Sequence, residues 1–256
     1  MVKLSFEDRG HGDAIVLLHG FPFDRSIWRF IHPQLEQEAR IISPDLRGHG
    51  KSPLVLEPYS IADIADDVVQ LLNRLDITRA VIAGHSMGGY VALEFARNYP
   101  DRMAGLALIA SHTYPDAPEK RVTRFEQAER VLTEPLLKVF SEMPTILTNV
   151  PWVEEEVRQA ILRSSPQGIS GALRAMAERF DTLSILSSMT VPAVIIAGLQ
   201  DKLISQERFR CMSHAMPKPW LVEIQNCGHL PMLEQPKATS DALRALLYAV
   251  RSERDN

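Results

Sequence analysis

The stretch from Gly84 to Gly88 has the form Gly-x-Ser-x-Gly, with Ser86 at its centre. Apolar residues precede it and a helix-like run begins at Tyr90, so the serine is expected on a sharp turn between a strand and a helix. Gly84 and Gly88 suit such a turn because a Cβ at either position would crowd the approach of the backbone to the helix. A serine presented in this way is a candidate nucleophile.

A serine hydroxyl is a poor nucleophile near neutral pH, so it needs a base within reach and a group that orients the base. His229 lies in the loop after the last expected strand, and Asp201 follows the apolar strand expected at 191–198. In open parallel sheets such groups gather at the carboxyl ends of the strands. The sequence therefore predicts a triad of Ser86, Asp201 and His229. Asp181, which follows no expected strand, is the rival acid.

Attack on an acyl carbonyl creates an oxyanion that must be stabilised by hydrogen-bond donors. The expected donors are the backbone N–H groups of Met87, at the helix N-terminus, and of Phe21. Pro22 biases Phe21 toward an extended backbone, which leaves its N–H group unpaired and oriented. His19 and His85 are interpreted as structural residues that shape the loops around this oxyanion hole.

Apolar strands alternate with amphipathic helices over most of the chain, a pattern that predicts a mostly parallel sheet with helices on both faces. The expected strands lie at residues 2–7, 14–18, 40–43, 80–83, 105–110, 191–198 and 220–224. Residues 112–188 interrupt this alternation with helical periods and are too long for a structureless loop. We expect them to form a helical cap inserted after the sixth strand, on a core domain formed by residues 1–111 and 189–256.

The cap is expected to cover a substrate pocket above the serine. The candidate pocket residues are Met143, Ile146, Leu147, Trp152 and Leu230. For each cap residue taken singly, packing of the cap helices against each other and against the sheet is the favoured interpretation.

The loop at 44–52 also carries groups that could do chemistry, namely Asp45, Arg47 and His49. Its glycines mark turns, and an Asp–Arg pair commonly ties such a loop to its neighbours, so we interpret these residues as structural. Asp67 lies outside the apolar stripe of the following helix and is expected to be solvated.

Bulk composition limits the class of protein. The chain has 256 residues and a net charge of −4, without the basic patch that nucleic acid binding requires. Two cysteines without C-x-x-C spacing indicate a reducing compartment. No signal peptide and no membrane span is evident, so a cytoplasmic protein without membrane association is expected. The absence of a long exposed apolar heptad favours a monomer or homodimer. No metal or other cofactor is expected.

Four motifs together resemble those of the α/β-hydrolase fold superfamily, in particular its capped serine esterases and enol-lactonase-like enzymes. They are His19-Gly-Phe-Pro22, Asp45-Leu-Arg-Gly-His-Gly-Lys-Ser52, Gly84-His-Ser-Met-Gly-Gly89, and Asp201 followed by Gly228-His229. The resemblance implies an α/β-hydrolase fold with a cap, a small-molecule substrate and no cofactor. Epoxide hydrolases and haloalkane dehalogenases of this family use an aspartate nucleophile, so Ser86 disfavours both activities.

The expected function is hydrolysis of small or medium carboxylic esters or lactones through an acyl-enzyme, as in carboxylesterases. The alternatives left open are 3-oxoadipate enol-lactonase-like or C–C bond hydrolysis, cofactor-free haloperoxidase or perhydrolase activity, and, least favoured, a ligand receptor without turnover. An arginine facing Ser86 would favour a carboxylate-bearing substrate, although exposure is the default for cap arginines. These arginines are Arg121, Arg124, Arg158, Arg163, Arg174 and Arg179.

Overall fold

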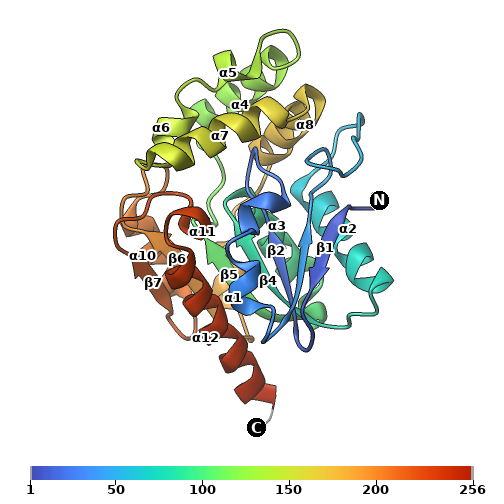
Figure 1. The fold of residues 1–256 in the computed structure, drawn as a ribbon, viewed down its shortest axis with the longest axis vertical. Coiled ribbons are helices and arrows are strands. Elements are labelled where there is room, and N and C mark those ends of the chain that lie inside the picture. Colours follow the sequence, from blue (N-terminus) through green and yellow to red (C-terminus); the bar gives the residue numbers. More distant parts are fainter. Residues whose placement is uncertain (1, 255–256) are drawn as a thin grey trace.

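A computed structural model of the chain describes residues 2–254. Its centre is a seven-stranded sheet with the order β1-β3-β2-β4-β5-β6-β7 (Figure 1). Only the β1–β3 pair is antiparallel among these strands. The strands are β1 (Phe6–Arg9), β2 (Ala14–Leu18), β3 (Arg40–Pro44), β4 (Ala80–His85), β5 (Met103–Ile109), β6 (Ala193–Gly198) and β7 (Leu221–Ile224).

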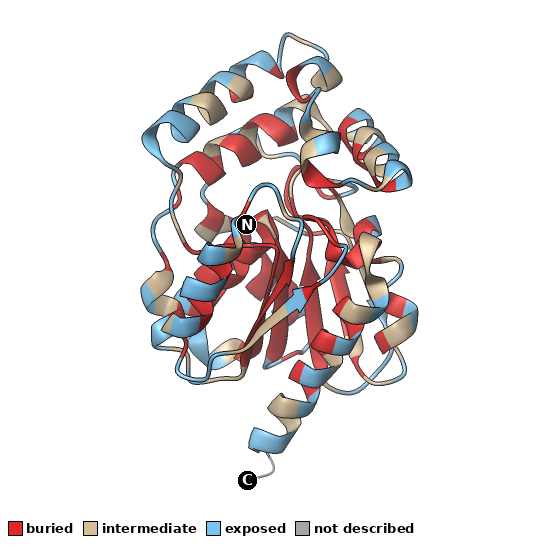
Figure 2. Ribbon diagram, turned by 90° about the vertical axis from the view of Figure 1, so that its left-hand side faces the viewer, coloured by how far each residue is buried: buried red, intermediate tan, exposed pale blue. Residues whose placement is uncertain are grey.

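Helices cover both faces of this sheet. Helices α1 (His32–Leu35) and α12 (Pro236–Arg254) pack on one face, and α2 (Ile61–Arg74) and α3 (Met87–Asn98) pack on the other. Strands β2, β4 and β6 are buried along their whole length, as their continuously apolar sequences require (Figure 2). The remaining elements of the sheet layer are the 3₁₀ turns η1 (Arg25–Trp28) and η2 (Pro100–Arg102), α10 (Gln206–Ala215) and α11 (Pro231–Glu234).

Six helices and no strand lie between β5 and β6, in a stretch that the structure describes completely. They are α4 (Pro118–Arg130), α5 (Leu136–Val139), α6 (Met143–Leu147), α7 (Pro151–Arg163), α8 (Pro166–Ala177) and α9 (Leu183–Ser187). Helices α4–α8 lie together beyond the carboxyl ends of the strands, at the top of Figure 1, and are called the helical layer below. Among the helices of residues 2–254, none combines the length and apolar character needed to cross a membrane.

The helical layer follows the fifth strand of the chain, so the expectation that it follows a sixth strand was wrong. Five strands were expected before residue 112 and five are present, so only the ordinal in that expectation was wrong and no expected strand is missing. The first strand begins at Phe6 instead of at residue 2, and the backbone N–H groups of residues 2 and 5 donate to side chains. The N–H of Val2 donates to Asp67 Oδ1 at 2.7 Å, and the N–H of Ser5 donates to Ser52 Oγ at 2.9 Å.

Asp67 is fully buried, which corrects its expected exposure to solvent. Its Oδ2 accepts a hydrogen bond from Arg47 Nε at 2.7 Å, and Arg47 is also buried. The loop at 44–52 is thus tied to helix α2 by an ion pair, as its structural interpretation implies. The pair uses Asp67 in place of Asp45, which instead accepts from Arg25 Nη1 at 3.0 Å.

Candidate active site

Ser86 occupies the turn between β4 and α3 with φ 49° and ψ −113°, a conformation that a non-glycine residue adopts only under strain. A Cβ added to Gly84 would lie 2.1 Å from the carbonyl oxygen of Gly88, and one added to Gly88 would lie 2.3 Å from a backbone oxygen of β2. Both positions therefore require glycine. The N–H of Ser86 donates to the Ile109 oxygen at 2.9 Å, and Ser111 Oγ donates to the Ser86 oxygen at 2.8 Å.

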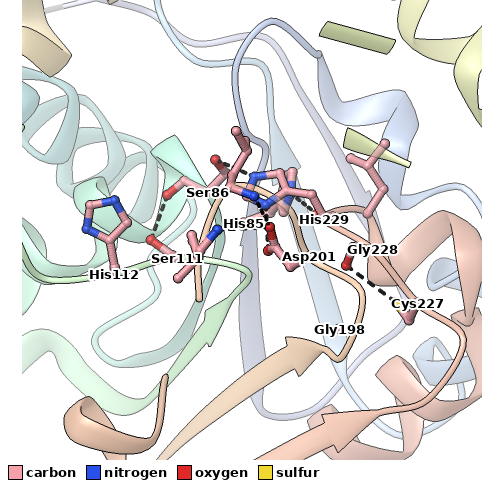
Figure 3. A network of polar contacts seen from close by, with 12 residues as sticks. His85, Ser86, Ser111, His112, Gly198, Asp201, Cys227, Gly228 and His229 are labelled. Atoms are coloured by element: carbon pink, nitrogen blue, oxygen red, sulfur yellow. Dashed lines mark hydrogen bonds and ion pairs between the residues drawn. The ribbon is translucent and has the colours of Figure 1, made fainter. Parts of the chain in front are cut away.

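The structure brings Ser86, His229 and Asp201 together in series (Figure 3). Ser86 Oγ lies 3.0 Å from His229 Nε2, and His229 Nδ1 lies 2.8 Å from Asp201 Oδ2. Asp201 Oδ1 accepts from the N–H groups of Leu203 at 2.8 Å and Ile204 at 3.1 Å. With Nδ1–H donating to the carboxylate, Nε2 is left to accept the serine proton.

The charge state of Asp201 follows from its surroundings. Burial by itself raises the pKa of this carboxyl, but the charge of His229 and its hydrogen bond, together with the N–H groups of Leu203 and Ile204, outweigh burial. The pKa of Asp201 therefore lies below its ordinary value. The carboxylate stays ionised near neutral pH and can stabilise an imidazolium at His229.

Three histidines support the site from below and are neutral. Burial is the main cause that lowers the pKa of His19 and of His49 to about 4, and that of His85 to about 3. His85 Nε2–H donates to the backbone oxygen of His229 at 2.8 Å, which fixes the position of the loop that carries the base. His19 Nε2 accepts from the N–H of Leu46 at 2.9 Å.

The His229 loop is also held by contacts that sequence reasoning missed. The N–H of His229 donates to the Leu147 oxygen at 2.9 Å. The Glu234 carboxylate accepts from the N–H groups of Gly228 at 2.9 Å and Leu230 at 3.0 Å. Only the nearness of Glu234 to His229 in the sequence could have indicated its part, because a carboxylate that binds backbone N–H groups leaves no sequence motif.

A cavity of about 580 Å³ lies over Ser86 and His229, between the helical layer and the sheet. This is within the range of small-molecule sites, which is about 300–1,000 Å³. Three of the five expected pocket residues, Met143, Ile146 and Leu147, line it. The other apolar lining residues include Val139, Phe140, Leu173 and Met176.

Two expected pocket residues lie elsewhere. The side chain of Trp152 is 47% exposed and packs edge-on against Phe30, with ring centroids 6.1 Å apart, because it lies on the outer side of helix α7. Leu230 is fully buried in the core behind the loop and is not part of the cavity wall. The rival acid Asp181 accepts from the N–H of Leu183 at 2.7 Å at the start of α9 and takes no part in the series of Ser86.

Of the two expected oxyanion donors, Phe21 borders the same space. Phe21 lines the cavity together with Ser86, and the Phe21–Pro22 peptide bond is cis. The N–H of Met87 is the first of helix α3, so no turn of the helix precedes it to supply an acceptor.

One wall of the cavity is polar. Lys120 and Arg124 of α4, Arg208 of α10, and Tyr90 and His112 all line it. Sequence reasoning did not single out Lys120, Arg208 or His112, since nothing in a local pattern reveals which helix face meets a cavity. Within residues 2–254 no cluster of three or more His, Cys, Asp or Glu side chains could hold a metal ion.

Comparisons with known proteins agree with this fold. Residues 15–242 match the model of the alpha/beta hydrolase family. The chain therefore belongs to that family.

Individual relatives include hydrolases of two kinds. An esterase from Thermogutta terrifontis, solved with malate bound, is 39% identical, with 97% of this chain and 94% of that chain covered and a TM-score of 0.94. The enol-lactonase from Burkholderia xenovorans LB400 shares the fold, with 24% identity, 96% and 97% coverage and a TM-score of 0.89. The dihydrolipoyllysine-residue acetyltransferase component of the acetoin cleaving system from Pseudomonas putida is 32% identical over 94% of this chain, which spans 65% of the length of that relative.

Proposed function

We propose that this protein is a serine hydrolase of small or medium carboxylic esters or lactones, with Ser86 as nucleophile, His229 as general base and acid, and Asp201 as the orienting acid. The observation that carries the proposal is the continuous series of contacts from Ser86 Oγ through His229 to Asp201, at 3.0 and 2.8 Å. The similarity to the Thermogutta terrifontis esterase supports it.

In the proposed reaction, Ser86 Oγ attacks the substrate carbonyl carbon while His229 Nε2 takes the hydroxyl proton. The N–H groups of Phe21 and Met87 stabilise the resulting oxyanion, and each such donor typically contributes about 3 kcal/mol to the transition state. The carbon–oxygen bond to the alcohol then breaks, and His229 returns the proton to the departing oxygen. For a lactone, that oxygen stays attached to the acyl group.

Water completes the cycle by the same steps in reverse. His229 Nε2 accepts a proton from a water molecule while the water oxygen attacks the acyl carbon. The bond from the acyl carbon to Ser86 Oγ then breaks as His229 returns the proton to Oγ. Residues 112–188 act in this proposal as a cap that closes the cavity over the reacting carbonyl. Exclusion of bulk water strengthens the electrostatic contacts beneath the cap.

The test compares the wild type with Ser86→Ala, using p-nitrophenyl acetate and butyrate as substrates and a fluorophosphonate as a covalent label. We expect hydrolysis and labelling by the wild type, and loss of both in Ser86→Ala. A kcat lowered by about 10⁶ is the expected scale for removal of such a nucleophile. A wild type that neither hydrolyses these esters nor becomes labelled at Ser86 would refute the proposal.

A further inference from the structure

The wall of the catalytic cavity carries more positive than negative charge. Its cationic side chains are those of Lys120, Arg124 and Arg208, and its carboxylates are those of Asp116 and Glu142. A cleft lined by an excess of one sign of charge attracts ligands of the opposite sign, because its low-dielectric walls focus the electric field. The distribution of these charges therefore indicates what the cavity accommodates.

Asp116 does not offset the cations of the cavity, because two guanidinium groups already share it. It contacts Arg124 Nε, and it accepts from Arg179 Nη2 at 2.9 Å, behind the cavity wall. The side chains of Asp116 and Arg179 are 6% and 4% exposed. Burial raises the pKa of Asp116, but the contacts with Arg179 and Arg124 outweigh it and lower this pKa, so the group carries one negative charge against two positive ones.

Lys120 and Arg208 have no acidic partner. Across residues 2–254, no carboxylate oxygen lies within the 4.0 Å that defines an ion pair from either side chain. The guanidinium of Arg208 lies over the ring of Tyr114 at 5.5 Å from its centroid. Burial, then the charges of Arg124 and Arg179, lower the pKa of Lys120 more than the charge of Asp116 raises it, so a bound anion would stabilise this ammonium group.

The two cationic residues of α4 belong to one face of that helix. Lys120, Arg124 and Gln127 all line the cavity, with the spacing of four and three residues that places side chains on one side of a helix. Ala117, at the N-cap, lines the cavity as well, and α4 begins without a side-chain cap. The positive end of the helix dipole therefore adds to the charge of this wall.

The field of these cations reaches the space beside the serine. His112 lines the cavity and follows Ser111, whose hydroxyl is bonded to the Ser86 backbone (Figure 3). Burial, and then the charges of Arg179 and Arg208, lower the pKa of His112 to about 3. An anion held by this wall would share one cavity with Ser86 Oγ.

We propose that the cavity selects esters or lactones that carry a carboxylate, which Lys120, Arg124 and Arg208 bind while the scissile carbonyl lies at Ser86. The inference rests on the proposed hydrolase function and names its substrate class. A half-ester of a dicarboxylic acid and a carboxylate-bearing lactone present the same chemistry to this wall.

The first experiment measures substrate preference in the wild type by titrating the released acid at constant pH. The charged substrates are the monomethyl esters of succinic, glutaric and adipic acid, and 4-acetoxybutanoate, which has its carboxylate on the alcohol side. Methyl butanoate, pentanoate and hexanoate, and butyl acetate, are the neutral counterparts. We expect kcat/KM for the best charged ester to exceed that of its counterpart about tenfold, mainly through KM.

Salt and ring closure give two further arms. In about 1 M salt, where the screening length is about 3 Å, the preference should shrink. A carboxylate-bearing γ-lactone compared with γ-butyrolactone shows whether the charged class includes cyclic esters. Equal kcat/KM for every charged and neutral pair would overturn the proposal.

Variants test which side chains are responsible. Lys120→Gln and Arg208→Gln each remove one charge from an exposed side chain, where substitutions rarely impair folding. Each should lower the ratio of charged to neutral kcat/KM about threefold to tenfold, and Arg208→Lys should restore part of it. Arg121→Gln is the matched control, because Arg121 neighbours Lys120 on α4, is 54% exposed and does not line the cavity.

Direct binding separates this proposal from the proposed reaction. Glutarate titrated calorimetrically into Ser86→Ala should bind, and Lys120→Gln in the same background should weaken it. Binding of glutarate without hydrolysis of any ester would refute the proposed reaction and leave carboxylate binding by this wall supported. Hydrolysis without preference for charged esters and without glutarate binding would refute carboxylate binding by this wall and leave the proposed reaction supported.

Discussion

The two sides of the cavity are built on different principles. The floor, defined as the proposed triad of Ser86, Asp201 and His229 with the supporting His19, His49 and His85, lies at or just after the carboxyl ends of strands β2, β3, β4, β6 and β7. The helical layer above it meets the cavity with a mixture of apolar and charged side chains. The sheet thus positions the proposed triad, and the helical layer supplies much of the remaining cavity wall.

The difference is also one of constraint. On the floor, backbone groups hold the residues of the proposed triad. For example, the N–H groups of Leu203 and Ile204 donate to Asp201 Oδ1. In the helical layer, prolines at the first turns of α4, α7 and α8 fix where these helices begin. They do not fix which face of a helix meets the cavity. Substitutions should accordingly be costly on the floor and mild in the layer.

After Ser86→Ala, the largest expected effect comes from Asp201→Asn, which keeps the shape of the proposed triad but removes its charge. The amide can hold His229 in the wrong tautomer, so kcat should fall about 10⁴-fold. Steady-state kinetics on p-nitrophenyl butyrate, with circular dichroism to confirm folding, measure this. A loss below about tenfold would mean that the orienting charge comes from elsewhere.

Gly84→Ala tests how rigid the floor is. The new Cβ would lie 2.1 Å from the Gly88 oxygen, and a backbone atom cannot give way as a side-chain end can. We expect the free energy of unfolding to fall by about 3 kcal/mol or more, measured by urea denaturation. Ser187→Ala, at an exposed residue of α9, is the control and should stay within about 0.5 kcal/mol. Similar losses in both variants would contradict a rigid turn.

The buried histidines of the floor predict how stability depends on pH. An unfolded histidine takes up its proton near pH 6.5, whereas folded His49 does so near 4, mainly because of burial. Between these values the unfolded chain binds more protons, so stability falls as the pH falls from 6.5 to 4. His49→Gln should reduce that slope by about 1.4 kcal/mol per pH unit at most. Exposed His214→Gln is the comparison, and an equal change in both variants would argue against burial as the cause.

The smallest effect should come from apolar residues of the helical layer. Met143→Ala widens the cavity and should raise KM for a neutral ester about fivefold, since loss of a methylene contact costs about 1 kcal/mol. Trp152→Ala removes a larger side chain that lies outside the cavity, so KM should stay unchanged. A larger effect of Trp152→Ala would place that residue on the substrate path.

Local sequence patterns are sufficient to indicate most residues of the floor. Glycine spacing around Ser86 follows from backbone contacts between a strand and the next helix, and such contacts act within a few residues. The apolar runs of β2, β4, β5 and β6 follow from burial on both faces, which leaves no alternation to misread. The start of the first strand was harder to place, because the N–H groups of Val2 and Ser5 donate to side chains instead of to a strand.

What the sequence alone determined is the order of chemical groups, Ser86, Asp201 and His229, each placed after an apolar strand. Only the tertiary structure decided that Arg124 and Lys120 face the cavity while Trp152 faces solvent, and that Glu234 and Leu147 hold the base in place. The physical reason is the separation along the chain over which each interaction acts. Turn sterics and strand burial act on neighbouring residues, whereas the face a helix presents to a cavity depends on packing between segments far apart in the chain.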